Sequence, residues 1–142
     1  MVVDLVKSES ILRLLCDGPV IPAARAMADF RYALENTSGP SVIILFGDIN
    51  SLPELLTLAQ QRKKKLVVHL DLFEGTGKDK AGVKLLSRMG VKEIITTKSH
   101  LGKVARDEGM LVIQRLFLVD SDALKTGLHV LQQFKPDAVE VL

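Results

Sequence analysis

A histidine and an aspartate stand in the segment LVVHLDLFEG, residues 66–75, which otherwise has the composition of a buried strand. Side chains alternate along a strand, so His69 and Asp71 are expected on one face. Burying an imidazole or a carboxylate is costly unless each group finds a partner. The two residues could form a satisfied pair in the core. Alternatively, they could act as acid and base, or bind the hydroxyl groups of a ligand beside the glycine-rich loop that follows them.

Polar residues also stand late in the other apolar runs of the chain. Glu140 interrupts one such run, and its carboxylate is expected to pair with Arg25 or Arg115, either as a structural ion pair or within a site. Lys98 is expected to contact an anion, since nothing around it indicates the desolvated amine of a Schiff base. The predicted ligand-binding residues are Arg25, Asp48, His69, Asp71, Lys98, Gln114, Arg115 and Glu140.

Two further segments bear on phosphate chemistry. The loop EGTGKD, residues 74–79, lacks the glycine and the Ser/Thr that a Walker motif requires, which argues against nucleotide hydrolysis. The basic run RKKK, residues 62–65, stands at the end of a predicted helix. Positive charge is favourable at a helix carboxyl end, and a contact with RNA phosphates is the alternative interpretation of this run.

Apolar strand-like runs alternate with helix-period runs along the chain. A capping box at residues 51–54 predicts where one helix begins, and Gly90 and Gly109 are expected to end two others. The predicted strands cover residues 20–25, 41–48, 66–73, 91–98, 111–119 and 137–142. The predicted helices cover residues 9–17, 27–36, 52–64, 80–89, 100–108 and 122–135.

Strands that are nearly continuous apolar runs are typical of a parallel sheet covered by helices. Two architectures fit this pattern, an open doubly wound sheet and a TIM-like (β/α) barrel. Polar residues late in nearly every strand favour the barrel, because all strand ends meet on its top face. Six strands are fewer than a barrel needs, and the last one ends on apolar residues. The sequence therefore predicts one α/β domain over residues 1–142, a TIM-like barrel that is incomplete at its carboxyl end.

Composition excludes several classes of protein. The 142 residues are 47% hydrophobic and 25% charged, and the net charge of +2 is too small to indicate a nucleic-acid-binding protein without other evidence. A single cysteine excludes an intrachain disulfide and a zinc site built on cysteine pairs. Five Phe, one Tyr and no Trp argue against a base-stacking platform of exposed aromatic residues. No apolar run is long enough for a membrane span or a signal peptide, so a cytoplasmic protein is expected.

Five segments resemble, in order and spacing, the glycerol-3-phosphate-responsive antiterminators. These are Ala24-Arg25, HLDLFEG, IITTKS, QRLFLVDS and PDAVEVL, and the resemblance covers residues 20–142. It implies a TIM-like barrel that binds glycerol 3-phosphate as effector, needs no cofactor and is not an enzyme. It also implies that the liganded protein binds the leader mRNA of a glycerol operon and prevents premature termination. The residues that the resemblance places at the top of the barrel are Arg25, His69, Asp71, Lys98, Gln114, Arg115 and Glu140.

The chain departs from the family pattern in two places. Lys98 stands where an arginine or a lysine is usual, and it offers a point charge rather than a planar fork. The family also continues beyond the final EVL into further strand ends, where barrels commonly bind phosphate. The expected partners are glycerol 3-phosphate and leader mRNA, with no membrane, and a homo-oligomer is left open. The alternatives are a barrel enzyme acting on a small phosphorylated polyol or sugar, with His69 and Asp71 as acid and base, and a half barrel that works as a binding module.

Overall fold

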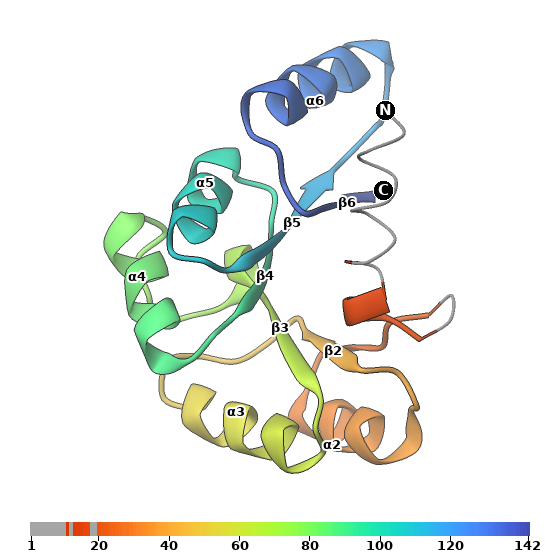
Figure 1. Ribbon diagram of the computed structural model, residues 1–142, viewed down its shortest axis with the longest axis vertical. Coiled ribbons are helices and arrows are strands. Elements are labelled where there is room, and N and C mark those ends of the chain that lie inside the picture. The colour runs from red at the N-terminus through yellow and green to blue at the C-terminus, as the bar shows by residue number, and fades with distance from the viewer. Residues whose placement is uncertain (1–10, 12, 18–19) are drawn as a thin grey trace.

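A computed structural model describes residues 11, 13–17 and 20–142 of the chain. Strands and helices alternate along it (Figure 1). The strands are β1 (Ala23–Ala24), β2 (Ser41–Ile44), β3 (Lys65–His69), β4 (Glu93–Thr96), β5 (Leu111–Leu116) and β6 (Ala138–Val141). The helices are α2 (Met27–Asn36), α3 (Leu52–Gln61), α4 (Lys80–Met89), α5 (Ser99–Asp107) and α6 (Ser121–Gln133), with a 3-10 turn η1 at Leu70–Leu72.

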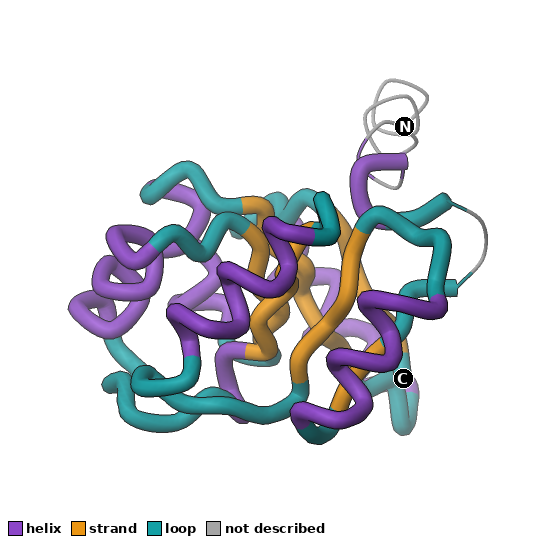
Figure 2. Tube along the Cα trace, turned by 90° about the horizontal axis from the view of Figure 1, so that it is seen from below, coloured by secondary structure: helices purple, strands orange, loops and turns teal. Residues whose placement is uncertain are grey.

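All six strands are parallel, and their order in the sheet is the order in the chain, β1 to β6. A doubly wound sheet reverses its strand order at a switch point, and this sheet does not. The strands follow an arc, and helices α2 to α6 lie along its outer side (Figures 1 and 2). The prediction of an incomplete TIM-like barrel is therefore confirmed.

The larger hydrophobic core lies between the sheet and the outer helices. Every second side chain of the strands points outward to meet the helices, as the pleat of a strand requires. Phe30, Leu55 and Leu101 are fully buried representatives of three of the helices. On the strand side, the core is formed by Ala24, Val42, Ile44, Leu66, Val68, Ile94 and Val112.

A smaller apolar layer covers the inner, concave face of the sheet. It consists of Ile43, Val67, Ile95 and Ile113, together with Leu15 from the segment that precedes β1. In Figure 1 this segment lies on the opposite side of the sheet from α2 to α6. Polar side chains follow on the same inner face toward the carboxyl ends of the strands. The fold therefore places an apolar floor beneath a polar layer.

The strands are shorter than predicted, because most end before the last polar residues of each run. β3 ends at His69, and the chain then turns through η1, so Asp71 is not a strand residue and the expected alternation does not apply to it. α3 begins at Leu52, as the predicted capping box requires, but the side-chain cap itself is wrong. Ser51 makes no cap to the helix with its side chain, and its backbone N–H is accepted instead by the carboxylate of Asp48, at 2.9 Å. Glu54, the second member of the box, pairs with Arg31 at 3.0 Å.

Helix limits agree better with the prediction. The bounds of α2 and α4 are those expected, and Gly90 ends α4 with a positive φ of 107°. Glycine is favoured there because a side chain strains the left-handed conformation. The predicted helix over residues 9–17 lies partly outside the described residues. Within the described part, no helix is long and apolar enough to span a membrane.

Candidate functional site

Asp71 is held at the carboxyl end of the sheet by the end of the neighbouring strand. The hydroxyl of Thr96 donates to its carboxylate at 2.6 Å, and the backbone N–H of Thr97 donates at 3.0 Å. The hydroxyl of Thr97 donates to it as well. Burial acts to raise the pKa of Asp71, but these hydrogen bonds to the charged form outweigh it, and the net pKa is lowered. Asp71 is therefore a fixed anion at neutral pH.

Replacing Asp71 with asparagine is expected to destabilise the protein by about 1 kcal/mol at pH 7, since hydrogen bonds to a charged acceptor are lost at a half-buried position. A carboxylate with a lowered folded-state pKa contributes its stability above the unfolded value, near 3.8. That contribution is lost as the pH falls through the folded-state pKa. Urea unfolding of wild type and D71N should therefore differ at pH 7, and the difference should shrink as the pH falls below the unfolded value. A difference that persists undiminished at pH 3 would contradict the assigned role.

Arg115 and Glu140 form a two-pronged ion pair across β5 and β6. The Nε and Nη2 atoms of Arg115 lie 2.6 and 3.2 Å from the two carboxylate oxygens of Glu140. The residues are register partners in the sheet, so both side chains rise from the inner face. Their side chains are 17% and 32% exposed. The expectation that Glu140 pairs with an arginine is confirmed, and the partner is Arg115 rather than Arg25.

His69 lies on the inner face at the carboxyl end of β3 and is 3% exposed. Neither ring nitrogen has a hydrogen-bond partner among the described residues. Burial, and next the positive charge of Arg115, lowers the pKa of His69 below its ordinary value of 6.5. Asp71 and Glu140 act in the opposite direction without outweighing them. The ring is therefore neutral at pH 7 and has one free donor and one free acceptor.

His69, Asp71, Arg115 and Glu140 lie near one another at the carboxyl end of the sheet. His69 is affected by the charges of all the others, which come from β5, β6 and η1. His69 and Asp71 are not hydrogen-bonded to each other, because the carboxylate is occupied by Thr96 and Thr97. They are thus not a hydrogen-bonded pair in the core. We call His69, Asp71, Arg115 and Glu140 the inner-face site.

Lys78 stabilises the segment that carries Asp71 through hydrogen bonds to its backbone. Its ammonium group donates to the backbone carbonyls of Leu70 and Phe73. Burial lowers the pKa of Lys78, while the nearby Asp71 acts to raise it. Sequence reasoning did not single out Lys78, Thr96 or Thr97 as parts of the site. The doubled threonine at a strand end was the available signal, since adjacent hydroxyl and N–H donors there can hold a carboxylate.

The remaining predicted ligand-binding residues are not members of the inner-face site. Arg25 and Lys98 are exposed at the ends of β1 and β4. The carboxylate of Asp48 accepts the backbone N–H groups of Asn50 and Ser51 at 2.7 and 2.9 Å, so it orders its own loop. Gln114 points to the outer face of β5, because it is adjacent to the inward-facing Arg115.

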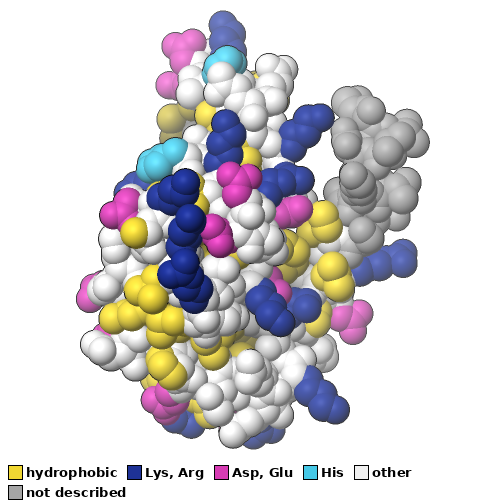
Figure 3. Space-filling view, turned by 60° about the vertical axis from the view of Figure 1, so that its left-hand side comes forward, with side chains coloured by type: hydrophobic (Ala, Val, Ile, Leu, Met, Phe, Trp, Pro, Cys, Tyr) yellow, Lys and Arg dark blue, Asp and Glu magenta, His cyan; other side chains and the backbone are white. Residues whose placement is uncertain are grey.

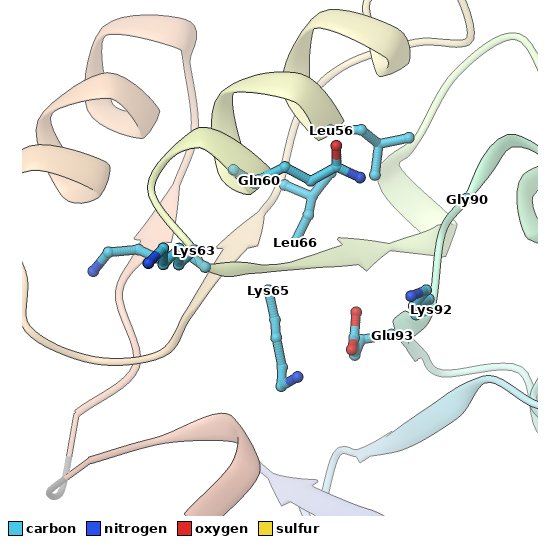
Figure 4. A pocket seen from close by; sticks show the side chains of 10 residues that line it. Leu56, Gln60, Lys63, Lys65, Leu66, Gly90, Lys92 and Glu93 are labelled. Atoms are coloured by element: carbon cyan, nitrogen blue, oxygen red, sulfur yellow. The ribbon is translucent and has the colours of Figure 1, made fainter.

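The basic run of residues 62–65 lies at the opposite end of the sheet, where Lys63, Lys64 and Lys65 line a cavity of about 320 Å³ together with Lys92 and Glu93 (Figure 4). Leu66 points toward α3, whereas Lys65 points to the other side of the strand. Lys64 donates to the carbonyl of Gly39 at 2.8 Å and therefore has a structural role. A contact of this run with RNA stays a prediction.

The described residues contain no group of three His, Cys, Asp or Glu side chains that could hold a metal ion.

A family model described as glycerol-3-phosphate responsive antiterminator matches residues 20–142. The chain belongs to this family. The resemblance inferred from five short segments is thereby confirmed, and so are antitermination, transcription regulation and glycerol metabolism as its context. An antiterminator is a regulator and not an enzyme, which agrees with the prediction.

Similar proteins agree with membership of the antiterminator family. The chain is 31% identical to a glycerol uptake operon antiterminator regulatory protein from Listeria monocytogenes str. 4b F2365, with a TM-score of 0.82 over 89% of this chain and 68% of that one. A glycerol uptake operon antiterminator-related protein from Thermotoga maritima MSB8 is 27% identical, with a TM-score of 0.79 over 90% and 72% of the two chains. The uncharacterized protein YgcP of Escherichia coli (strain K12) is 30% identical over 93% of this chain and 69% of its own length.

Proposed function

We propose that this protein binds glycerol 3-phosphate in the inner-face site and responds by binding the leader mRNA of a glycerol utilisation operon. His69 carries the proposal. A buried imidazole with two unpartnered nitrogens is costly to keep, unless a ligand supplies the missing partners. A hydroxyl group both donates and accepts, so one or two hydroxyls of a polyol would satisfy this ring.

The charges around His69 suit a small anionic polyol. Arg115 is neutralised by Glu140, so the pair offers hydrogen-bonding groups rather than a strong net charge. Lys98 and Arg25 are exposed cations that follow β4 and β1, and either could receive a phosphate. The arrangement favours hydroxyls near the buried imidazole and the phosphate nearer to solvent.

Exposed basic residues offer a route to RNA phosphates. The outer helices α4 and α5 carry the exposed residues Lys80, Arg88, Lys103 and Arg106. Figure 3 shows Lys and Arg side chains in a row on the face to which these helices contribute. A ligand changes RNA affinity only if it binds the RNA-competent state more tightly. Thr96 and Thr97, which donate hydrogen bonds to Asp71, connect the inner-face site to the start of α5. A ligand-dependent change in RNA affinity would therefore act through this segment.

A filter-binding titration of the operon leader RNA, with and without glycerol 3-phosphate, tests the proposal. We expect the ligand to tighten RNA binding about tenfold, which corresponds to a coupling of about 1.4 kcal/mol. Glycerol and inorganic phosphate, supplied separately, serve as controls and should have smaller effects. The ligand should be recovered unchanged. RNA binding that is independent of glycerol 3-phosphate at every salt concentration would overturn the proposal, and so would its consumption.

A further inference from the structure

A second cavity, of about 330 Å³, opens on the outer side of the sheet, near the carboxyl end of β5 and between the starts of α5 and α6. Gln114 in its wall faces the opposite side of β5 from the floor of the inner-face site, and Arg115 of that site also lines it. We call it the outer pocket. Its walls combine hydroxyl groups, apolar side chains and one buried amide, contributed among others by Ser99, Gln114, Phe117, Thr126, Gly127 and Val130.

The buried amide of Gln114 lacks a partner on one side. Gln114 is 1% exposed. Its Nε2 atom donates to the backbone carbonyls of Thr97 and Arg115, at 3.0 and 3.3 Å. Its Oε1 atom has no donor among the described residues. A buried acceptor in this state needs an N–H or O–H group from something that enters the pocket.

The aromatic ring of Phe117 stands at the same pocket and is 54% exposed. Phe30, Phe73 and Phe134 are buried in the core instead. In the part of the chain that the structure describes, the one pair of aromatic rings in contact joins Phe30 to Phe46. Phe117 therefore has a free face. A single ring cannot form the platform of several aromatic residues that composition argues against, but it can stack one planar group.

We propose that the outer pocket receives one unpaired base of the RNA. The base would donate an N–H group to Gln114 Oε1 and stack on Phe117, as bases in single-stranded RNA commonly stack on aromatic side chains. Every standard base has both an N–H donor and a flat face. The nucleotide's phosphate would lie near Lys98 and the amino end of α5, whose first turn has no acidic residue. This inference rests on the proposed function and adds to it a place and a mode of RNA recognition.

The outer pocket is connected to the inner-face site by direct hydrogen bonds. The side chain of Gln114 donates a hydrogen bond to the carbonyl of Thr97, and the backbone N–H of Thr97 donates one to Asp71. A displacement of Asp71 would therefore be transmitted to the backbone that orients Gln114. RNA affinity that depends on an effector requires such a physical connection between two sites.

The test uses the full natural chain and fluorescently labelled single-stranded leader RNA, with binding followed by anisotropy in the presence of glycerol 3-phosphate. We expect F117A to weaken RNA binding about tenfold, the effect of losing one stacked base. T126L should weaken binding as much, because the larger leucine side chain would fill the pocket that Thr126 lines. The matched control is V119A, because Val119 is 82% exposed and does not line the pocket. Thermal unfolding and glycerol 3-phosphate binding should be unchanged in all three variants.

The outcomes separate this inference from the proposed function. RNA binding by F117A and T126L that equals that of V119A and wild type overturns the outer pocket and leaves the antiterminator proposal intact. Absence of RNA binding by the wild type overturns both. Binding of a free nucleoside monophosphate that is lost in F117A, without any effect of F117A on RNA, would assign the pocket to a small nucleotide and overturn its role in RNA recognition.

Discussion

A leucine in place of His69 is expected to weaken glycerol 3-phosphate binding about 10- to 100-fold without destabilising the protein. The loss of affinity follows because the ligand hydroxyls lose both their donor and their acceptor. The fold should keep its stability or gain about 1 kcal/mol, since replacing an unsatisfied buried polar group by an apolar one of similar size removes a cost. Calorimetric titration of the ligand and urea unfolding of the free protein measure the two effects.

The combination of lost binding and retained stability distinguishes a functional residue from a structural one. The control is H129L, because His129 is exposed on α6 and pairs with Gln133. H129L should bind glycerol 3-phosphate as the wild type does. If H69L instead unfolds more easily and binds the ligand normally, His69 has a structural role and the inner-face site is not the effector site.

Replacing Phe73 with alanine is expected to lower the free energy of unfolding by about 3–5 kcal/mol. Phe73 is 2% exposed and packs in the core beneath the loop that carries Asp71. Its carbonyl also accepts a hydrogen bond from Lys78, so the residue belongs to the segment that positions Asp71. A loss of this size is a large fraction of the 5–15 kcal/mol typical of a domain.

The neighbouring residue offers a matched control. Leu72 is 49% exposed, and L72A should cost less than about 1 kcal/mol. Urea unfolding of both variants, with fluorescence and circular dichroism as separate probes, measures the difference. Equal effects of the two substitutions would show that the ring of Phe73 does not carry the packing described above.

The succession of elements could be predicted from the sequence because it depends on local pattern. Apolar periodicity and glycine stops place α2 and α4 at their observed bounds. Continuous apolar strands between helices predict the parallel sheet, and late polar residues in nearly every strand predict the barrel. The outward orientation of Gln114 could also have been predicted from the sequence, because adjacent residues of a strand face opposite sides.

The contacts of the site depend on elements that are distant in the chain. Asp71 is bound by Thr96 and Thr97, 25 and 26 positions away, and Arg115 is paired with Glu140 across 25 positions. Such pairs depend on the register between strands and on where each strand ends, and neither is written in the local pattern. β3 ends at His69, and Lys78 and the threonines hold the turn that follows, so a run that looks like a strand continues as η1.

The sequence alone thus determined the order of strands and helices, the residue types available at the strand ends, and the family. The tertiary structure decided which of those residues meet, that the imidazole of His69 is left without a partner, and that Gln114 serves a second cavity. The physical reason is that backbone periodicity is set by neighbouring residues, whereas hydrogen-bond satisfaction is set by whatever the fold brings within about 3 Å.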